Sequence, residues 1–149
     1  MSSKRITMLG VTLLEVMLVL AVAATIIVMS VRYYRTATAG RQANEALVMI
    51  QSMTALADRL AQGSNSYASI DLTTKIPKLM PNQNMTSPWG SQVTIRAMSS
   101  DKIRIILPAT PEAVCIQLDQ MLTANKAYVS STTCPAAVND VTVFYSRQI

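Results

Sequence analysis

The hydrophobic positions of the chain follow different patterns in different parts of its length. Residues 11–29 form a nearly continuous apolar run, in which only Thr12, Glu15 and Thr25 are polar. At about 1.5 Å per helical residue, such a run is long enough for a helix to cross the ~30 Å hydrocarbon core of a bilayer. The pattern therefore predicts a membrane-spanning helix at the beginning of the chain.

After this run the apolar residues recur at steps of three and four, which is typical of one face of an amphipathic helix. They are Ala43, Ala46, Leu47, Ile50, Met53, Ala57 and Leu60. Because no proline occurs before Pro77, we expect one helix from about Thr12 to Gln62. We also expect Gly63 to be its C′ residue and Gly40 to be the interior position at which the helix bends most easily.

The rest of the chain changes to a strand-like pattern. Residues 63–90 are mostly polar with no sustained period, and they predict a long loop with at most a short helical turn around residues 72–76. Alternating apolar residues then predict a β-hairpin, with strands at residues 93–97 and 103–107 and a turn at residues 99–101.

A short helix and two further strands complete the predicted head. Thr110 is the expected N-cap and Pro111 the first-turn proline of a helix over about residues 111–123. The remaining strand candidates are residues 128–129 and 141–145. The predicted fold class is α+β, with a long N-terminal helix packed on a small, mainly antiparallel sheet.

The chain contains two cysteines, Cys115 and Cys134, and no histidine. A structural zinc site usually takes four ligands from cysteine and histidine, so the composition argues against a metal site. A disulfide is the better interpretation, and it indicates an oxidising compartment such as the bacterial periplasm or the cell surface. The alternative is a pair of unrelated buried thiols.

The short segment before the apolar run is basic. It carries Lys4 and Arg5, and positive charge beside the first span holds that end in the cytoplasm. We therefore expect the chain to cross the membrane once, with its N-terminus inside. A secretory signal peptide would have a small-residue cleavage site after its apolar core, whereas here Gly10 precedes the core.

Glu15 is the residue of the apolar run that most requires an explanation. A carboxylate inside a membrane helix costs roughly 2.5–3.5 kcal/mol by insertion scales, so it usually marks a position at which the helix meets a partner charge. The sequence therefore identifies Glu15 as the main candidate for a functional role.

The basic leader followed by G-V-T-L-L-E at residues 10–15 resembles the class III signal of type IV prepilins. The resemblance implies that a prepilin peptidase cuts after Gly10 and that Val11 becomes the N-methylated first residue of the mature protein. It also implies an assembly role for Glu15, which would neutralise the amine of Val11 on a neighbouring subunit. A plain signal anchor would explain the hydropathy but not the positions of Gly10 and Glu15.

The same resemblance implies a domain organisation. It gives a leader peptide over residues 1–10, a transmembrane and filament-core helix over residues 11–39, and a globular pilin head with a C-terminal disulfide loop over residues 40–149. A helix within the cysteine loop, Val11 in place of phenylalanine and Arg32 in place of proline resemble the IVb class more than the IVa class.

The function implied is that of a structural subunit of a type IV pilus. The subunit would be stored in the bacterial inner membrane and polymerised through its N-terminal helix into an extracellular filament that serves adhesion, aggregation or a related surface function. The implied partners are copies of itself or other pilus subunits, the prepilin peptidase, the inner-membrane assembly machinery and membrane lipid before assembly. No cofactor is expected.

Three alternatives stand beside this interpretation. A type II secretion pseudopilin has the same signal but usually lacks the C-terminal disulfide. The second alternative is a minor pilin or DNA-uptake pilin. A DNA-uptake pilin would require a clustered basic strip with aromatics, and the positive charges, with a net charge of +5, are too scattered to favour nucleic acid as a partner. The candidate strip is weak and consists of Lys75, Lys78, Lys102 and Arg104.

The third alternative is a membrane-anchored enzyme. Four glycines in the whole chain do not supply a glycine-rich phosphate loop, and the lack of histidine removes the commonest general base. The composition therefore argues for a structural protein and against an enzyme.

Overall fold

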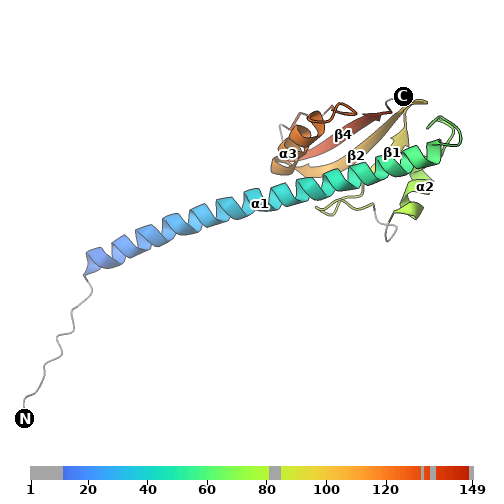
Figure 1. Ribbon diagram of the computed structural model, residues 1–149. Coiled ribbons are helices and arrows are strands. Elements are labelled where there is room, and N and C mark those ends of the chain that lie inside the picture. Colours follow the sequence, from blue (N-terminus) through green and yellow to red (C-terminus); the bar gives the residue numbers. More distant parts are fainter. Residues whose placement is uncertain (1–11, 81–84, 132, 135–136, 148–149) are drawn as a thin grey trace, which may run out of the picture. The chain divides into compact units, whose positions relative to one another are not determined.

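Figure 1 shows the computed structural model of the chain. The chain consists of two units, of which the first ends at Thr36 and the second begins at Ala37. One helix, α1 (Leu13–Ala61), contributes residues to both units. The residues that the structure describes are 12–80, 85–131, 133–134 and 137–147.

In the described residues of the first unit, the chain is helical from Leu13 onward, and all of these side chains are exposed. The helix forms because this stretch contains no glycine or proline and its backbone groups are satisfied within the helix itself. The single long helix expected from the sequence is confirmed, with its observed ends within one residue of the predicted ones.

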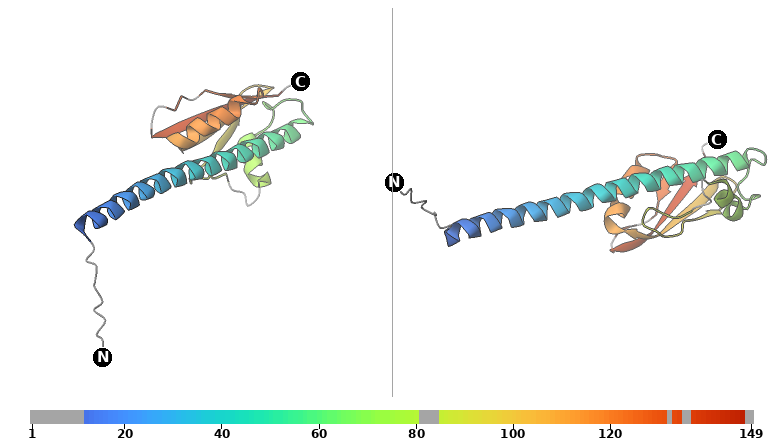
Figure 2. Two further views of the ribbon diagram at one scale, coloured as in Figure 1. Left: turned by 60° about the vertical axis from the view of Figure 1, so that its left-hand side comes forward. Right: turned by 90° about the horizontal axis from the view of Figure 1, so that it is seen from below.

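The second unit combines the rest of α1 with a four-stranded sheet and two short helices (Figure 2). The strands lie in the order β1-β2-β4-β3, and each neighbouring pair is antiparallel. This arrangement confirms the predicted α+β fold. The elements after α1 are α2 (Leu72–Leu79), β1 (Thr94–Ala97), β2 (Lys102–Pro111), α3 (Glu112–Thr123), β3 (Tyr128–Ser130) and β4 (Val138–Ser146).

One face of the sheet and the later part of α1 enclose the core of this unit. Strand alternation turns Ile103, Ile105 and Leu107 of β2 towards the core, and Val143 of β4 lies directly opposite Ile105. Helix α1 buries its small and apolar side chains, whereas Leu47 and Leu60 are only partly buried and pack at the margin of the core. The buried residues of α1 are Ala39, Ala43, Ala46, Ile50, Met53, Thr54, Ala57 and Ala61.

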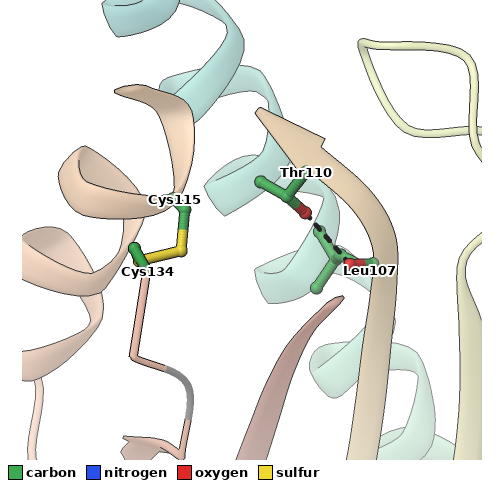
Figure 3. Close-up of a disulfide and its surroundings, with 4 residues drawn as sticks. All are labelled: Leu107, Thr110, Cys115 and Cys134. Carbon is green, nitrogen blue, oxygen red and sulfur yellow. Dashed lines mark hydrogen bonds between the residues drawn. A yellow bond between two sulfur atoms is a disulfide. The ribbon is translucent and has the colours of Figure 1, made fainter. Parts of the chain in front are cut away.

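The prediction for the start of α3 is wrong. Strand β2 continues through Thr110 and Pro111, and α3 begins at Glu112 without a side-chain cap. The sheet register shifts between Leu107 and Thr110, and the intervening Ala109 has a φ of 54°. The buried Thr110 hydroxyl donates to the carbonyl of Leu107 at 3.0 Å, as Figure 3 shows, so it stabilises this bulge instead of capping the helix.

The predictions for two glycines of α1 also need correction. The residue with positive φ after the helix is Asn65 (52°), not Gly63, and the amide of Asn65 donates to the carbonyl of Ala61 at 2.7 Å. Gly40 lies within the continuous helix, where a Cβ atom would stand 3.3 Å from Oε1 of Gln117. Gly40 therefore leaves room for the Gln117 side chain of α3.

The predicted loop contains more structure than its composition suggests. Its helical turn extends to Leu79 as α2, and the Asp71 carboxylate caps this helix by accepting hydrogen bonds from the amide and hydroxyl of Thr74. At the other end of the segment, the indole of Trp89 is partly buried against the core and donates to the carbonyl of Pro108 at 2.9 Å.

Candidate functional site

The first turn of α1 holds the carboxylate of Glu15 in a capping box. The amide and the hydroxyl of Thr12 donate to Oε2 of Glu15 at 3.0 and 3.2 Å, and the amide of Glu15 donates to the Thr12 hydroxyl oxygen at 3.3 Å. This reciprocal arrangement satisfies amide groups that the helix leaves without a partner at its beginning. The carboxylate is thus hydrogen-bonded within its own chain.

Sequence reasoning identified Glu15 but missed Thr12. The signal was present, because a threonine followed three residues later by a glutamate is the sequence pattern of a capping box. The carboxylate therefore has a local structural role, in addition to any role in pairing with another subunit.

The apolar part of α1 presents its side chains outward. Leu13 is 78% exposed and Met29 is 71% exposed, and no residue of the most apolar stretch is buried. The hydroxyls of Thr25 and Ser30 donate to the carbonyls of Val22 and Ile26, both at 2.8 Å, so these polar groups are satisfied within the helix. By length and composition this helix can cross a membrane.

A polar and aromatic segment follows the apolar part. Arg32, Tyr33, Tyr34 and Arg35 are all exposed. Aromatic and basic side chains of this kind suit the boundary between lipid and water. Gly10 and Val11, the predicted cleavage and methylation residues, lie outside the described residues, as do Lys4 and Arg5.

The predicted disulfide between Cys115 and Cys134 is confirmed (Figure 3). The two Cα atoms are 6.0 Å apart, and Cys115 is buried on the inner side of α3. The bridge ties α3 to the segment that leads into β4. Among the described residues, no group of three or more His, Cys, Asp or Glu side chains could hold a metal ion.

Asp58, near the end of α1, accepts hydrogen bonds from two tyrosines. Tyr67 donates its hydroxyl to Oδ1, and Tyr145 of β4 donates to Oδ2 at 2.8 Å. Burial, with a further contribution from the Asp58 hydrogen bond, raises the pKa of Tyr145 to about 12, and the same causes raise the pKa of Tyr67. This cluster joins α1 to the last strand of the sheet.

The polar contacts of α1 with the sheet continue one turn earlier. The hydroxyls of Thr54 and Tyr128 lie 3.0 Å apart in a hydrogen bond, and the Tyr128 ring lies 5.2 Å from that of Tyr145. Sequence reasoning placed Tyr128 and Tyr145 in strands but did not connect them with Asp58 or Thr54, because these partners come from distant parts of the chain. The cluster has a structural role, since its groups satisfy one another.

Comparison with known proteins gives a distant match to pilus subunits. The chain is 27% identical over 120 residues to the protein named major structural subunit of bundle-forming pilus, both in Escherichia coli O127:H6 (strain E2348/69 / EPEC) and in Escherichia coli O111:H-. Each match covers 73% of this chain and 62% of the relative, so the chain spans less than two thirds of the length of these relatives.

No family model matches the chain, and no solved structure matches it. Both distant relatives are named as structural subunits of a pilus.

Proposed function

We propose that the protein is a structural subunit of a type IV pilus, which is stored in a bacterial inner membrane and then polymerised into an extracellular filament. The observation that carries this proposal is the start of α1, an uncovered apolar helix with a single acid in its first turn. The name of the two relatives, major structural subunit of bundle-forming pilus, supports it.

In this proposal Glu15 acts during assembly. Cleavage after Gly10 by a prepilin peptidase would create a cationic amine on Val11, and an apolar bundle of helices would leave that amine without a counter-charge. Both hydrogen bonds from Thr12 end on Oε2 of Glu15, so Oε1 can accept from the amine of a neighbouring subunit. The pair then offsets the cost of burying both charges.

The membrane form of the subunit has one span with its N-terminus in the cytoplasm. Lys4 and Arg5 favour that orientation. The Cys115–Cys134 bridge supports an oxidising location for the second unit, on the other side of the membrane. Lipid covers the apolar part of α1 before assembly, and neighbouring helices cover it afterwards.

The IVb class is the better assignment within this proposal. Most of helix α3, from Cys115 onward, lies inside the loop that the Cys115–Cys134 bridge closes, as in the IVb class that the sequence resembles. Val11 and Arg32 agree with the same class. The bridge also favours a pilus subunit over a type II secretion pseudopilin, since pseudopilins usually lack a C-terminal disulfide.

The proposal is tested in the native host, with N-methylation as one of the measured features. Electron microscopy should show filaments that are lost when the gene is deleted and restored by the gene in trans. Mass spectrometry of purified filaments should find this protein beginning at Val11, with a methylated amine. Filaments that lack the protein, or filament subunits that begin at Met1, would contradict the proposal.

A cleavage-site variant supplies the matched control. Gly10→Val places a branched side chain at the proposed cut and should leave the full-length precursor in the membrane without filaments. Gly63→Val, at an exposed position where a Cβ atom meets nothing within 4 Å, should leave maturation unchanged.

A further inference from the structure

The outer face of the sheet carries a cluster of positive charge. Arg96 of β1 lies opposite Arg104 of β2, and Arg104 lies opposite Phe144 of β4. Phe144 in turn lies opposite Val129 of β3, and Lys102 precedes Arg104 by two residues on the same face. The five side chains form what we call the basic sheet face, which is turned away from the core.

The cations of the basic sheet face form no ion pair among the described residues, although Lys102 interacts electrostatically with the neighbouring Asp101. The ion pair found in that part of the chain joins Arg41 to Glu45 on α1, and Nε of Arg104 is buried without a hydrogen-bond partner. Strands β1 and β2 contain no acidic residue. The nearby Asp101 accepts a hydrogen bond from the hydroxyl of Ser99 at 2.7 Å.

A hollow lies beside these cations. It has a volume of about 430 Å³, and its walls are mostly apolar. Val129 is 59% exposed and Met98 is 53% exposed, so apolar groups at this site remain in contact with solvent. The hollow could accept an aliphatic side chain that is flanked by negative charges. Its lining residues are Met98, Lys102, Val129, Phe144, Tyr145 and Ser146.

Helix α3 presents the complementary pattern. Its charged residues are Glu112 and Asp119, both acidic, and Ile116 lies between them with 44% of its surface exposed. At 100° per residue these three positions fall within an arc of about 60°, and they span about 10 Å along the helix. We call them the acidic stripe. The arc excludes Gln117, which lies against Gly40 of α1.

We propose that the acidic stripe of one subunit docks on the basic sheet face of a second copy of this chain. Ile116 enters the hollow beside Phe144, while Glu112 and Asp119 approach the arginines and Lys102. The inference rests on the proposed pilus function and adds a contact between heads to the contact between helices. The occupant is a second copy because the chain itself carries the matching arrangement of two acids around one exposed apolar side chain.

This contact is heterologous, because it joins two different surfaces of the same molecule. Each subunit that docks its acidic stripe still offers a free basic sheet face, so the contact repeats along an open assembly. Charge pairs at a solvent-exposed margin chiefly select the partner and fix the register, while the buried apolar side chain contributes more of the affinity.

Zero-length cross-linking of wild-type filaments tests the contact directly. A carbodiimide joins a lysine amine to a carboxylate only when the two are in contact, so mass spectrometry should find Lys102 linked to Glu112 or Asp119 of another copy. Lys102→Arg keeps the charge and should retain filaments while losing this link. Intact filaments in which Lys102 forms no link to either acid would overturn the inference and leave the pilus function standing.

Charge reversal tests the contact by a second route. In the full-length protein, Arg96→Glu with Lys102→Glu should reduce the number of filaments about tenfold or more. The new carboxylates would repel the acidic stripe of the neighbouring subunit. Glu112→Lys with Asp119→Lys should do the same. Combining all four substitutions restores the attraction with exchanged signs, so the number of filaments should recover.

The matched control reverses two exposed cations elsewhere. Lys75→Glu with Lys78→Glu on α2 makes the same change in net charge and should leave the filament number near that of wild type. Proteolysis of the membrane-stored subunits checks that each variant is folded. Failure of the fourfold variant to recover although every variant is folded would contradict the inference.

A different occupant would give a different result. If the basic sheet face serves an anionic polymer, wild-type filaments should bind a single-stranded oligonucleotide and the Arg96→Glu, Lys102→Glu variant should form normal filaments that do not bind it. That outcome would overturn the proposed contact between copies. Absence of wild-type filaments would instead contradict the proposed function itself.

Discussion

The two parts of helix α1 differ in the pattern and burial of their side chains. From Leu13 to Met29 its side chains are nearly all apolar and all are exposed, whereas from Ala39 onward the helix buries a single stripe. The two parts have the same backbone structure. They differ in whether the chain itself covers their apolar side chains.

Because of this difference, we expect the second unit to determine the stability of the fold and the first unit to determine assembly. The second unit covers its own stripe with the sheet, so its core is complete within one chain. The apolar surface of the first unit has no cover among the described residues, and in the proposed function lipid or other helices provide it. Substitutions in the first unit should therefore affect polymerisation, while substitutions in the core of the second unit should affect stability.

Glu15→Ala should give the largest effect. It removes a costly charge from lipid, so the subunit should accumulate in the membrane at least as well as wild type, but the Val11 amine would enter the helix bundle without a partner. The loss of several kcal/mol is repeated at every added subunit, so filaments should be absent. Quantitative immunoblotting and electron microscopy measure the two effects.

Glu15→Gln separates charge from hydrogen bonding, because the amide oxygen can still accept from Thr12 but carries no charge. It should also fail to assemble. Normal filament numbers for both variants at normal subunit levels would show that Glu15 does not pair with the amine.

Removal of the disulfide should have the next largest effect, and it should be confined to the second unit. We expect a soluble fragment beginning at Ala37 to fold alone, since the core residues from Ala39 onward all lie within it. Cys115→Ala with Cys134→Ala should lower its free energy of unfolding by about 3 kcal/mol, because the bridge restricts the unfolded chain. Urea titration of the fragment with and without a reducing agent measures this loss. Equal urea midpoints of unfolding under the two conditions would contradict the prediction.

A smaller effect is expected at the contact between Asp58 and Tyr145. Tyr145→Phe removes one donor to the carboxylate and should cost about 1 kcal/mol at neutral pH. Because the folded-state pKa of Tyr145 is raised to about 12 from the usual 10, its stabilising contribution is complete below pH 10 and is lost as the pH rises towards 12.

The fragment's free energy of unfolding should therefore fall over that range, and by less in the Tyr145→Phe variant. Tyr67 has a raised pKa as well, so part of the fall should persist in this variant. Urea titrations at several pH values measure both slopes. Identical slopes for wild type and variant would contradict the role assigned to Tyr145.

Thr12→Ala should give the smallest effect. It removes the capping box and should destabilise the first turn of α1 by about 1 kcal/mol, so the amides of Glu15 and Val16 should exchange hydrogen faster in a membrane mimetic. Thr12→Ser keeps a hydroxyl and should restore slow exchange. Thr25→Ala is the control, because its hydroxyl bonds within the helix interior at Val22.

The parts of the fold that could be predicted from the sequence depend on local periodicity. Steps of three and four gave α1 almost to its ends, and alternation gave the core strands, because such patterns reflect a single buried face. The start of α3 could not be predicted in this way. Thr110 and Pro111 have the residue types of a helix start, but pairing with β4 holds them in the sheet.

The residues of the candidate site could likewise be predicted only where the neighbouring sequence or the composition marks them. Glu15 stands out in an apolar run and the cysteines stand out by composition, so both could be identified. The Asp58 cluster and the complete basic sheet face depend on the position of β4, which is distant from β2 in the chain. Arg96 and Arg104 lie on the predicted hairpin, whereas Phe144 joins them only because β4 pairs next to β2.

The strand order has a consequence for truncation of the chain. Strand β4 comes after β3 in the sequence, yet it lies between β2 and β3 in the sheet. The pairing of β4 with β2 joins segments that are distant in the sequence, and such pairing forms late in folding. A chain that is cut before Val138 therefore lacks one of the two inner strands, leaves the edges of β2 and β3 open and becomes a target for proteases.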